Sequence, residues 1–131
     1  MAGSVAVTHV RISNIRKVVL ACVGDAATGS IPDTVLPAFE GLLLALGTAP
    51  GSPQPTSLYD ITIVDQFARD VIEGVGANRS QTLPEKANIV FSGTGTHPPV
   101  DEADTLTFKV ANQSVASAQF TVTLYYSLGG G

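Results

Sequence analysis

The chain has 131 residues, of which 44% are hydrophobic and only 14% charged, and its net charge is −4. This length is typical of a single domain, here residues 1–131, and such a domain can bury a core without a metal or a disulfide. The Lys and Arg residues are scattered along the chain. This argues against nucleic-acid binding, which needs a concentrated basic patch.

The single cysteine, Cys22, cannot form an internal disulfide and lies in an apolar run over 18–23. A free cysteine in such a run packs as a small hydrophobic residue, so we predict a buried, unreactive thiol. The lack of disulfides is typical of assembly in a reducing cytoplasm. The N-terminal residues lack the basic start and apolar core of a secretory signal, and the apolar runs are shorter than the ~18 residues of a membrane span. We therefore expect no membrane partner.

The first elements of the chain are predicted to be strands. Apolar and polar side chains alternate from Val5 onward, which predicts a strand over 5–12. A second strand is expected over 16–23. The Gly-, Asp- and Ser-containing stretch 24–30 has the composition of a loop.

Residues 35–46 can be interpreted in two ways. Apolar side chains recur at helical spacing, but Pro37 and Gly41 lie inside the segment and each weakens a helix. We therefore predict a connection over 33–39 that holds at most one helical turn, followed by a strand over 41–46 that is buried on both faces. A helix over the whole segment is the alternative.

A loop and a hairpin are predicted next. The stretch 47–57 is rich in Pro, Gly and Ser, which favours a loop. Strands over 58–65 and 69–73, joined by a turn at 66–68, are expected to form a β-hairpin. The corner at 74–78 contains glycine and asparagine, which tolerate positive φ and let the chain leave the sheet sharply.

The next segment has weak signals. Residues 79–88 are polar and are expected to be irregular, ending in a short apolar run over 88–91. A turn region is predicted over 93–99 because glycine, threonine and proline dominate it.

The clearest strands lie near the C-terminus. Alternating side chains predict strands over 105–110 and 118–128, with 111–117 as a polar hairpin connection between them. The final glycines, 129–131, are expected to fray. About seven or eight short antiparallel strands predict an all-β fold, either a β-sandwich or a jelly-roll-like small barrel.

The sequence offers little to build a catalytic or metal site. The stretch 93–96 lacks the third glycine of a phosphate-binding loop and is interpreted as a β-turn. His97 lies near the carboxylates of 101–104, but the spacing matches no known metal motif, so we interpret that region as a solvated acidic loop. We predict no enzymatic activity, no cofactor and no metal.

Carboxylates also crowd the predicted hairpin. Paired carboxylates can hydrolyse glycosides, but the chain has no tryptophan to stack a sugar. We interpret them as surface charges at strand ends, with Arg69 and Arg79 as partners. They are Asp60, Asp65, Asp70 and Glu73.

The middle of the chain resembles small virion proteins of tailed bacteriophages. The residues that carry the resemblance are Leu42–Leu44, Pro50-Gly51, Pro55, Tyr59-Asp60-Ile61-Thr62, Asp65, Asp70-Val71 and Gly74–Arg79. One departure is Ala68, where a glycine is expected in the hairpin turn. The resemblance implies a non-enzymatic capsid decoration (cement) protein on the capsid exterior, made in the host bacterial cytoplasm.

The resemblance also implies partners. These are the major capsid protein and further copies of this chain, as a dimer or trimer on a symmetry axis. Because loops and chain ends reach neighbouring molecules most easily, the predicted contact residues are Ala2, Gly3, Ser4, Pro50, Pro53, Pro55, His97 and Pro98. The alternatives are a tail or head–tail joining protein and, with less support, a carbohydrate-binding or hydrolytic β domain.

Overall fold

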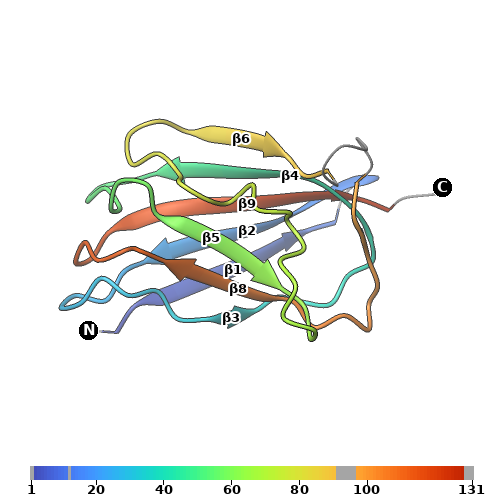
Figure 1. Ribbon diagram of the computed structural model, residues 1–131, viewed down its shortest axis with the longest axis horizontal. Coiled ribbons are helices and arrows are strands. Elements are labelled where there is room, and N and C mark those ends of the chain that lie inside the picture. Colours follow the sequence, from blue (N-terminus) through green and yellow to red (C-terminus); the bar gives the residue numbers. More distant parts are fainter. Residues whose placement is uncertain (1, 12, 91–96, 129–131) are drawn as a thin grey trace.

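The computed structural model describes residues 2–11, 13–90 and 97–128, and these form an all-β protein without a helix (Figure 1). The strands are β1 (Ser4–Val10), β2 (Ile15–Val23), β3 (Thr34–Val35), β4 (Gly41–Pro50), β5 (Asp60–Val64), β6 (Glu85–Asn88), β7 (Pro99–Val100), β8 (Thr107–Ala111) and β9 (Gln119–Ser127). The predicted all-β class is confirmed.

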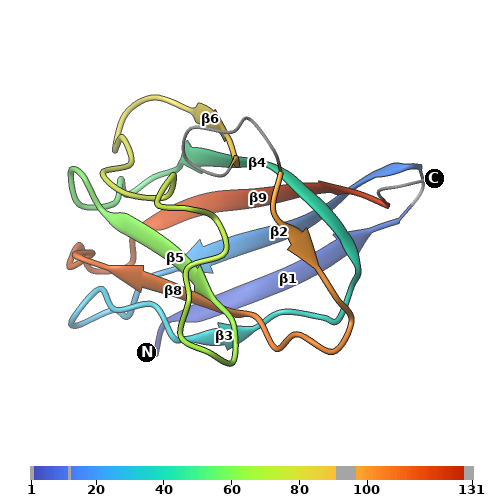
Figure 2. The same ribbon diagram turned by 45° about the vertical axis from the view of Figure 1, so that its right-hand side comes forward.

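The strands form two antiparallel sheets. The larger is six-stranded, with the order β1-β2-β9-β4-β6 and with β7 also pairing with β4. The smaller is three-stranded, with the order β3-β8-β5. In Figures 1 and 2 the smaller sheet covers one face of the larger sheet, in a sandwich-like arrangement.

The core lies between the two sheets and follows the alternation of side chains along the strands. The predicted apolar face of 118–128 is confirmed, since its residues are at most 3% exposed: Phe120, Val122, Leu124 and Tyr126. The smaller sheet contributes Ile61, Ile63 and Phe108, which are also fully buried. Cys22 is 2% exposed, and burial raises the pKa of its thiol to about 12, as expected for an inert core residue.

The ambiguous segment 35–46 is not a helix. Thr34 and Val35 form the two-residue strand β3, so the helical turn allowed for 33–39 is absent there. β4 begins at Gly41, as predicted, but continues to Pro50 and takes in the start of the predicted loop. Gly41 has φ of 146°, and a Cβ there would lie 1.9 Å from the carbonyl oxygen of Ser127. Only glycine therefore fits this entry into the sheet.

The predicted hairpin over 58–73 is correct in its turn at 66–68 but wrong in its second strand. β5 pairs with β8, a strand far away in sequence, and residues 69–73 form turns instead of a second strand. They contact β5 through the bridge between Val64 and Asp70, the 2.8 Å bond from the Val71 N–H to the Ile63 carbonyl and the 3.2 Å bond from the Ile63 N–H to the Asp70 carboxylate. Ala68, where glycine was expected, does adopt a positive φ of 61°.

The connection over 111–117 is also not a hairpin, because β8 and β9 belong to different sheets. Gln113, which is 9% exposed, holds this crossover in place. Its amide donates to the Gly29 carbonyl at 2.5 Å and accepts from the Thr56 N–H at 2.9 Å. The predicted irregular stretch 79–88 contains β6, whereas 91–96, 129–131 and Ile12 lie outside the described residues.

Candidate functional site

The predicted contact residues separate into two groups at opposite ends of the larger sheet. Ser4 pairs with Val23, which pairs with Gln119, and the Gln119 N–H donates to the Pro53 carbonyl at 2.9 Å. The N-terminal residues and the 50–55 loop therefore share one end. His97 and Pro98 lie at the other end, where β4 begins.

Several of these residues are poorly placed to meet a partner. Pro55 and Pro98 are buried, and the Pro98 carbonyl accepts the Leu43 N–H at 2.9 Å. His97 is half-buried, with Nδ1 2.7 Å from the Ile89 carbonyl oxygen. Pro53 is exposed. Pro55 and Pro98 thus pack inside the fold, and of these three prolines only Pro53 is exposed to a partner.

Gly3 and Ser4, two of the predicted contact residues, already pack against other parts of the chain. Ser4 is already the first residue of β1, paired with Val23. Gly3 is half-buried, and a Cβ there would lie 2.3 Å from the Ser30 carbonyl oxygen. The chain is therefore packed against the 24–30 loop from Gly3 onward.

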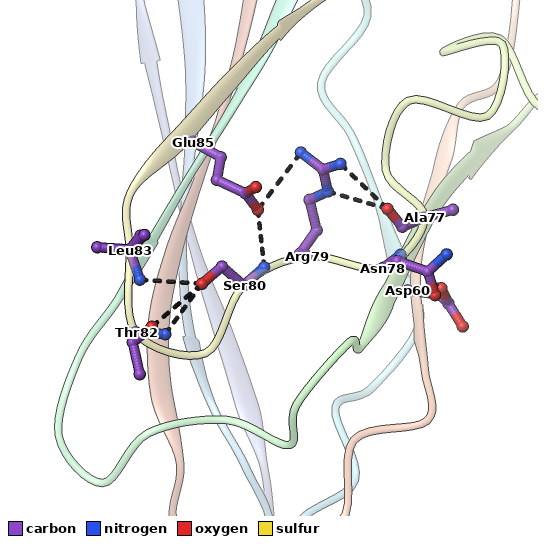
Figure 3. Close-up of polar contacts among 8 residues, drawn as sticks. All are labelled: Asp60, Ala77, Asn78, Arg79, Ser80, Thr82, Leu83 and Glu85. Atoms are coloured by element: carbon purple, nitrogen blue, oxygen red, sulfur yellow. Dashed lines mark hydrogen bonds and ion pairs between the residues drawn. The ribbon is translucent and has the colours of Figure 1, made fainter.

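The segment with the phage resemblance forms a local polar network (Figure 3). The Asn78 N–H donates to the Asp60 carboxylate at 2.8 Å, and the Arg79 side chain donates to the Ala77 carbonyl at 3.1 and 3.2 Å. Arg79 also lies 3.6 Å from Glu85, whose carboxylate accepts the Ser80 N–H at 2.7 Å. These contacts fix a tightly turned stretch of backbone, so the motif has a structural role.

The carboxylates of this region were interpreted as partners of arginine, and this is wrong for Asp60, Asp65 and Asp70. Each of them accepts backbone N–H groups instead. The ion pairs are formed by Glu73, 2.7 Å from Arg69, and by Glu85. The aspartate carboxylates thus supply the hydrogen-bond acceptors that a neighbouring strand would otherwise offer to these backbone N–H groups.

The acidic loop after His97 is also organised by backbone contacts. The Asp101 and Ala103 N–H groups donate to the carboxylates of Asp104 and Asp101 at 3.0 and 2.9 Å. Across residues 2–11, 13–90 and 97–128, no three His, Cys, Asp or Glu side chains come together as metal ligands.

The feature best suited to binding is the edge strand β1. Its sequence, SVAVTHV, contains no Asp, Glu, Lys, Arg or Pro, and most of its residues are exposed. Among the described residues, only β2 pairs with it. Its outward N–H and C=O groups can therefore accept another strand, a contact that natural proteins usually block with charges, proline or a covering segment.

The opposite edge of the same sheet is protected. β6 has four residues, includes Glu85 and Lys86, and follows directly on Pro84. Short length, charge and a nearby proline all hinder pairing with another chain. The two edges thus differ, and only β1 offers a long uncharged template.

A polar cluster anchors the far end of β1. His9 Nε2 lies 2.5 Å from the Tyr126 hydroxyl, and Arg11 Nε–H donates to His9 Nδ1 at 3.1 Å. Because Nδ1 accepts, the imidazole is neutral and Nε2–H donates to Tyr126. Burial, followed by the charges of Arg11 and Arg16, lowers the pKa of His9. The cluster ties the end of the edge strand to β9.

Replacing Arg11 with alanine is expected to raise the pKa of His9 toward its ordinary value of 6.5. The substitution removes both a positive charge and a donor that only the neutral ring can accept. Because the folded-state pKa is lowered, this histidine's contribution to stability is complete above pH ~6.5 and declines as the pH falls below that value. An NMR titration of the imidazole measures the shift. Lys17→Ala, on the other face of the sheet, is the control and should leave the pKa unchanged.

The sequence contained a signal for the edge strand, the absence of charge over residues 4–10, but not its position in the sheet. Strand order depends on pairing between distant segments, which local patterns do not record. The His9–Tyr126 contact was missed for the same reason.

Comparison with known protein families, with curated protein sequences and with solved structures finds no match. The described residues contain no helix that is long and apolar enough to span a membrane.

Proposed function

We propose that this chain is a structural virion protein of a tailed phage that binds the outer surface of the capsid and bridges capsomers as a decoration protein. The observation that carries the proposal is the open, uncharged edge strand β1. The resemblance over residues 42–79 supports the same class of protein. The major capsid protein is the proposed partner, and the capsid exterior is the proposed location.

The proposed mode of binding is β-strand addition. A strand of the shell lies against β1 and forms main-chain hydrogen bonds, while side chains of β1 alternate above and below. One such contact is weak, but a shell repeats it many times, and a protein that touches two capsomers at once gains affinity through effective concentration. This arrangement stabilises a preformed shell without any catalytic group.

Substitution of Val7 by lysine is the sharpest test of this proposal. Val7 lies on β1 and is 37% exposed, so a lysine can reach water without breaking the fold, yet its charge opposes strand addition at the edge. Removing residues 1–8 is a poorer test, because it deletes most of β1 and exposes β2. Val35→Lys adds the same charge on the smaller sheet, where Val35 is 63% exposed, and serves as the matched control.

Co-sedimentation with undecorated phage shells, followed by heating, gives the readout. The unmodified protein and Val35→Lys should sediment with shells and raise the temperature at which the shells rupture. The amount of Val7→Lys that sediments with shells should be at least about tenfold lower, as expected for loss of a central contact. If the unmodified protein does not bind shells, the decoration proposal is wrong and binding to isolated tails tests the tail-protein alternative. If Val7→Lys binds as well as the control, β1 is not the contact.

A further inference from the structure

The outer face of the larger sheet is largely uncovered, since its described residues are exposed or half-buried apart from Ala45, which is 4% exposed. The strand registers place its outward side chains in four rows, running from β1 through β2 and β9 to β4. The rows are Val10–Lys17–Tyr125–Ala45, Thr8–Val19–Thr123–Gly47, Ala6–Ala21–Thr121–Ala49 and Ser4–Val23–Gln119, with Gly51 bonded beside Gln119.

The chemistry of this face differs from that of the whole protein. The chain carries a net charge of −4, yet these rows contain no carboxylate, and Lys17 is their only charged residue. Alanine, glycine, threonine and valine dominate the rest. A face with small, uncharged side chains is easily desolvated and can pack closely on another sheet.

The face also has a raised end and a hollow end. At the raised end, Lys86 from β6 places Nζ 4.2 Å from the centre of the Tyr125 ring. A hollow of about 290 Å³, bordered on the β6 side by Glu85, runs from there over Gly47 and Ala49. It adjoins a second hollow of about 220 Å³ bordered by Ala21, Ala49 and Gly51. The two hollows share Ala49 and Thr121, so they form one shallow trough.

We propose that this outer face binds the outer face of a second copy of the chain, around a two-fold axis near the row of Val19, Thr123 and Gly47. A two-fold rotation places the raised end of each copy over the hollow end of the other. The Tyr125 ring of one protomer then fills the hollow beside Ala49 of its partner. The interface is self-complementary, with one patch used twice.

The area of the face agrees with a weak dimer. Strands about 4.8 Å apart and residues about 3.4 Å apart make the four rows roughly 19 Å by 24 Å, or about 450 Å² of flat area per copy. Protruding side chains and the neighbouring residues of β6 add to this flat area. The two copies together then bury roughly 1,200 Å², which is the lower limit for specific interfaces. We therefore expect dissociation in dilute solution and dimers at high local concentration.

The positive charges of the face do not oppose this arrangement. Lys17 and Lys86 both lie toward the raised end, next to Tyr125. The two-fold rotation moves the Lys17 of the partner copy about 14 Å along the strands from Lys17, and Lys86 is exposed at the rim of the face on β6. Separations beyond the Debye length of about 8 Å are largely screened at physiological salt.

The dimer proposal does not depend on shell binding. Stacking of outer faces leaves the free edge of β1 accessible, so both contacts can exist together. The dimer is measured in the absence of shells, so its failure and the failure of the decoration proposal are separate results.

Sedimentation velocity of the full chain over a wide concentration range tests the dimer. The unmodified protein should shift from monomer to dimer as concentration rises. Ala21→Arg, which places a charge inside the proposed interface one row from the axis, should remain monomeric, and Tyr125→Ala should raise the dimer Kd about tenfold. Thr62→Arg adds the same charge to β5 in the smaller sheet and should dimerise normally. Circular dichroism confirms that each variant is folded.

Two results would overturn the proposal. One is an unmodified protein that stays monomeric at the highest concentration. The other is equal dimerisation of folded Ala21→Arg, Tyr125→Ala and Thr62→Arg, which would place any dimer interface elsewhere.

Discussion

Replacing Gly76 with alanine is expected to lower the free energy of unfolding by about 2–4 kcal/mol, as overpacking in a rigid site does. A Cβ at this position would lie 2.2 Å from the Ile61 carbonyl oxygen and 3.0 Å from the Ile61 Cβ. Neither atom can move away easily, because Ile61 is 1% exposed and its N–H donates to the Gly76 carbonyl at 2.8 Å. The alanine variant must therefore displace the turn from β5.

Gly74→Ala is the matched control, two residues earlier in the same turn. Gly74 has φ of 80°, but a Cβ there would meet no atom within 4 Å. Its replacement costs only backbone strain, about 1 kcal/mol. Urea unfolding of both variants measures the difference. Equal losses of stability would show that close approach of the backbone to Ile61 is not what requires glycine at position 76.

The pattern of buried side chains could be predicted from the sequence, because it depends only on local alternation. The apolar face of 118–128 packs inward as expected, and the predicted strand 16–23 matches β2. Gly41 and Pro37 correctly argued against a helix, since each opposes helical backbone wherever it occurs. These signals do not require knowledge of distant neighbours.

Pairing partners could not be predicted in the same way. The segments 58–65 and 69–73 looked like a hairpin because they are adjacent, yet β5 pairs with β8. The side chains of Asp65 and Asp70 satisfy backbone groups in the turns, so a second strand is unnecessary. Likewise, buried Gln113 lets 111–117 cross between sheets. Short polar side chains that bond to backbone compete with strand pairing, and composition alone does not show which arrangement wins.

The candidate binding surfaces could not be predicted either, because they depend on the order of the strands. Predicted contacts were placed in loops because loops are exposed in general, but Pro55 and Pro98 are buried. The uncovered edge of β1 and the outer face of the larger sheet arise from strand order. Both are visible in the sequence only as stretches that lack charge, a signal that buried strands give as well.

Replacing Asp70 with alanine should also destabilise the protein strongly. Its carboxylate accepts the N–H groups of Ile63, Ile72 and Gly74 at 3.2, 3.3 and 3.0 Å. Ile63 and Ile72 are fully buried, so water cannot easily replace the lost acceptor. Leaving buried donors unsatisfied costs about 1–3 kcal/mol each, and we expect a combined loss of about 2–4 kcal/mol.

Asp65→Ala is the control for the loss of a turn aspartate. The Asp65 carboxylate also accepts backbone N–H groups, those of Phe67 and Arg69 at 2.9 and 3.1 Å. Both donors belong to exposed residues, and Phe67 is 80% exposed, so water can replace the carboxylate. We therefore expect a loss below about 1 kcal/mol. Thermal and urea unfolding give both values, and native-state hydrogen exchange should show faster exchange of the Ile63 and Ile72 amides only in Asp70→Ala. If the two substitutions cost the same, burial of the donors does not make Asp70 the main anchor of the turn on β5.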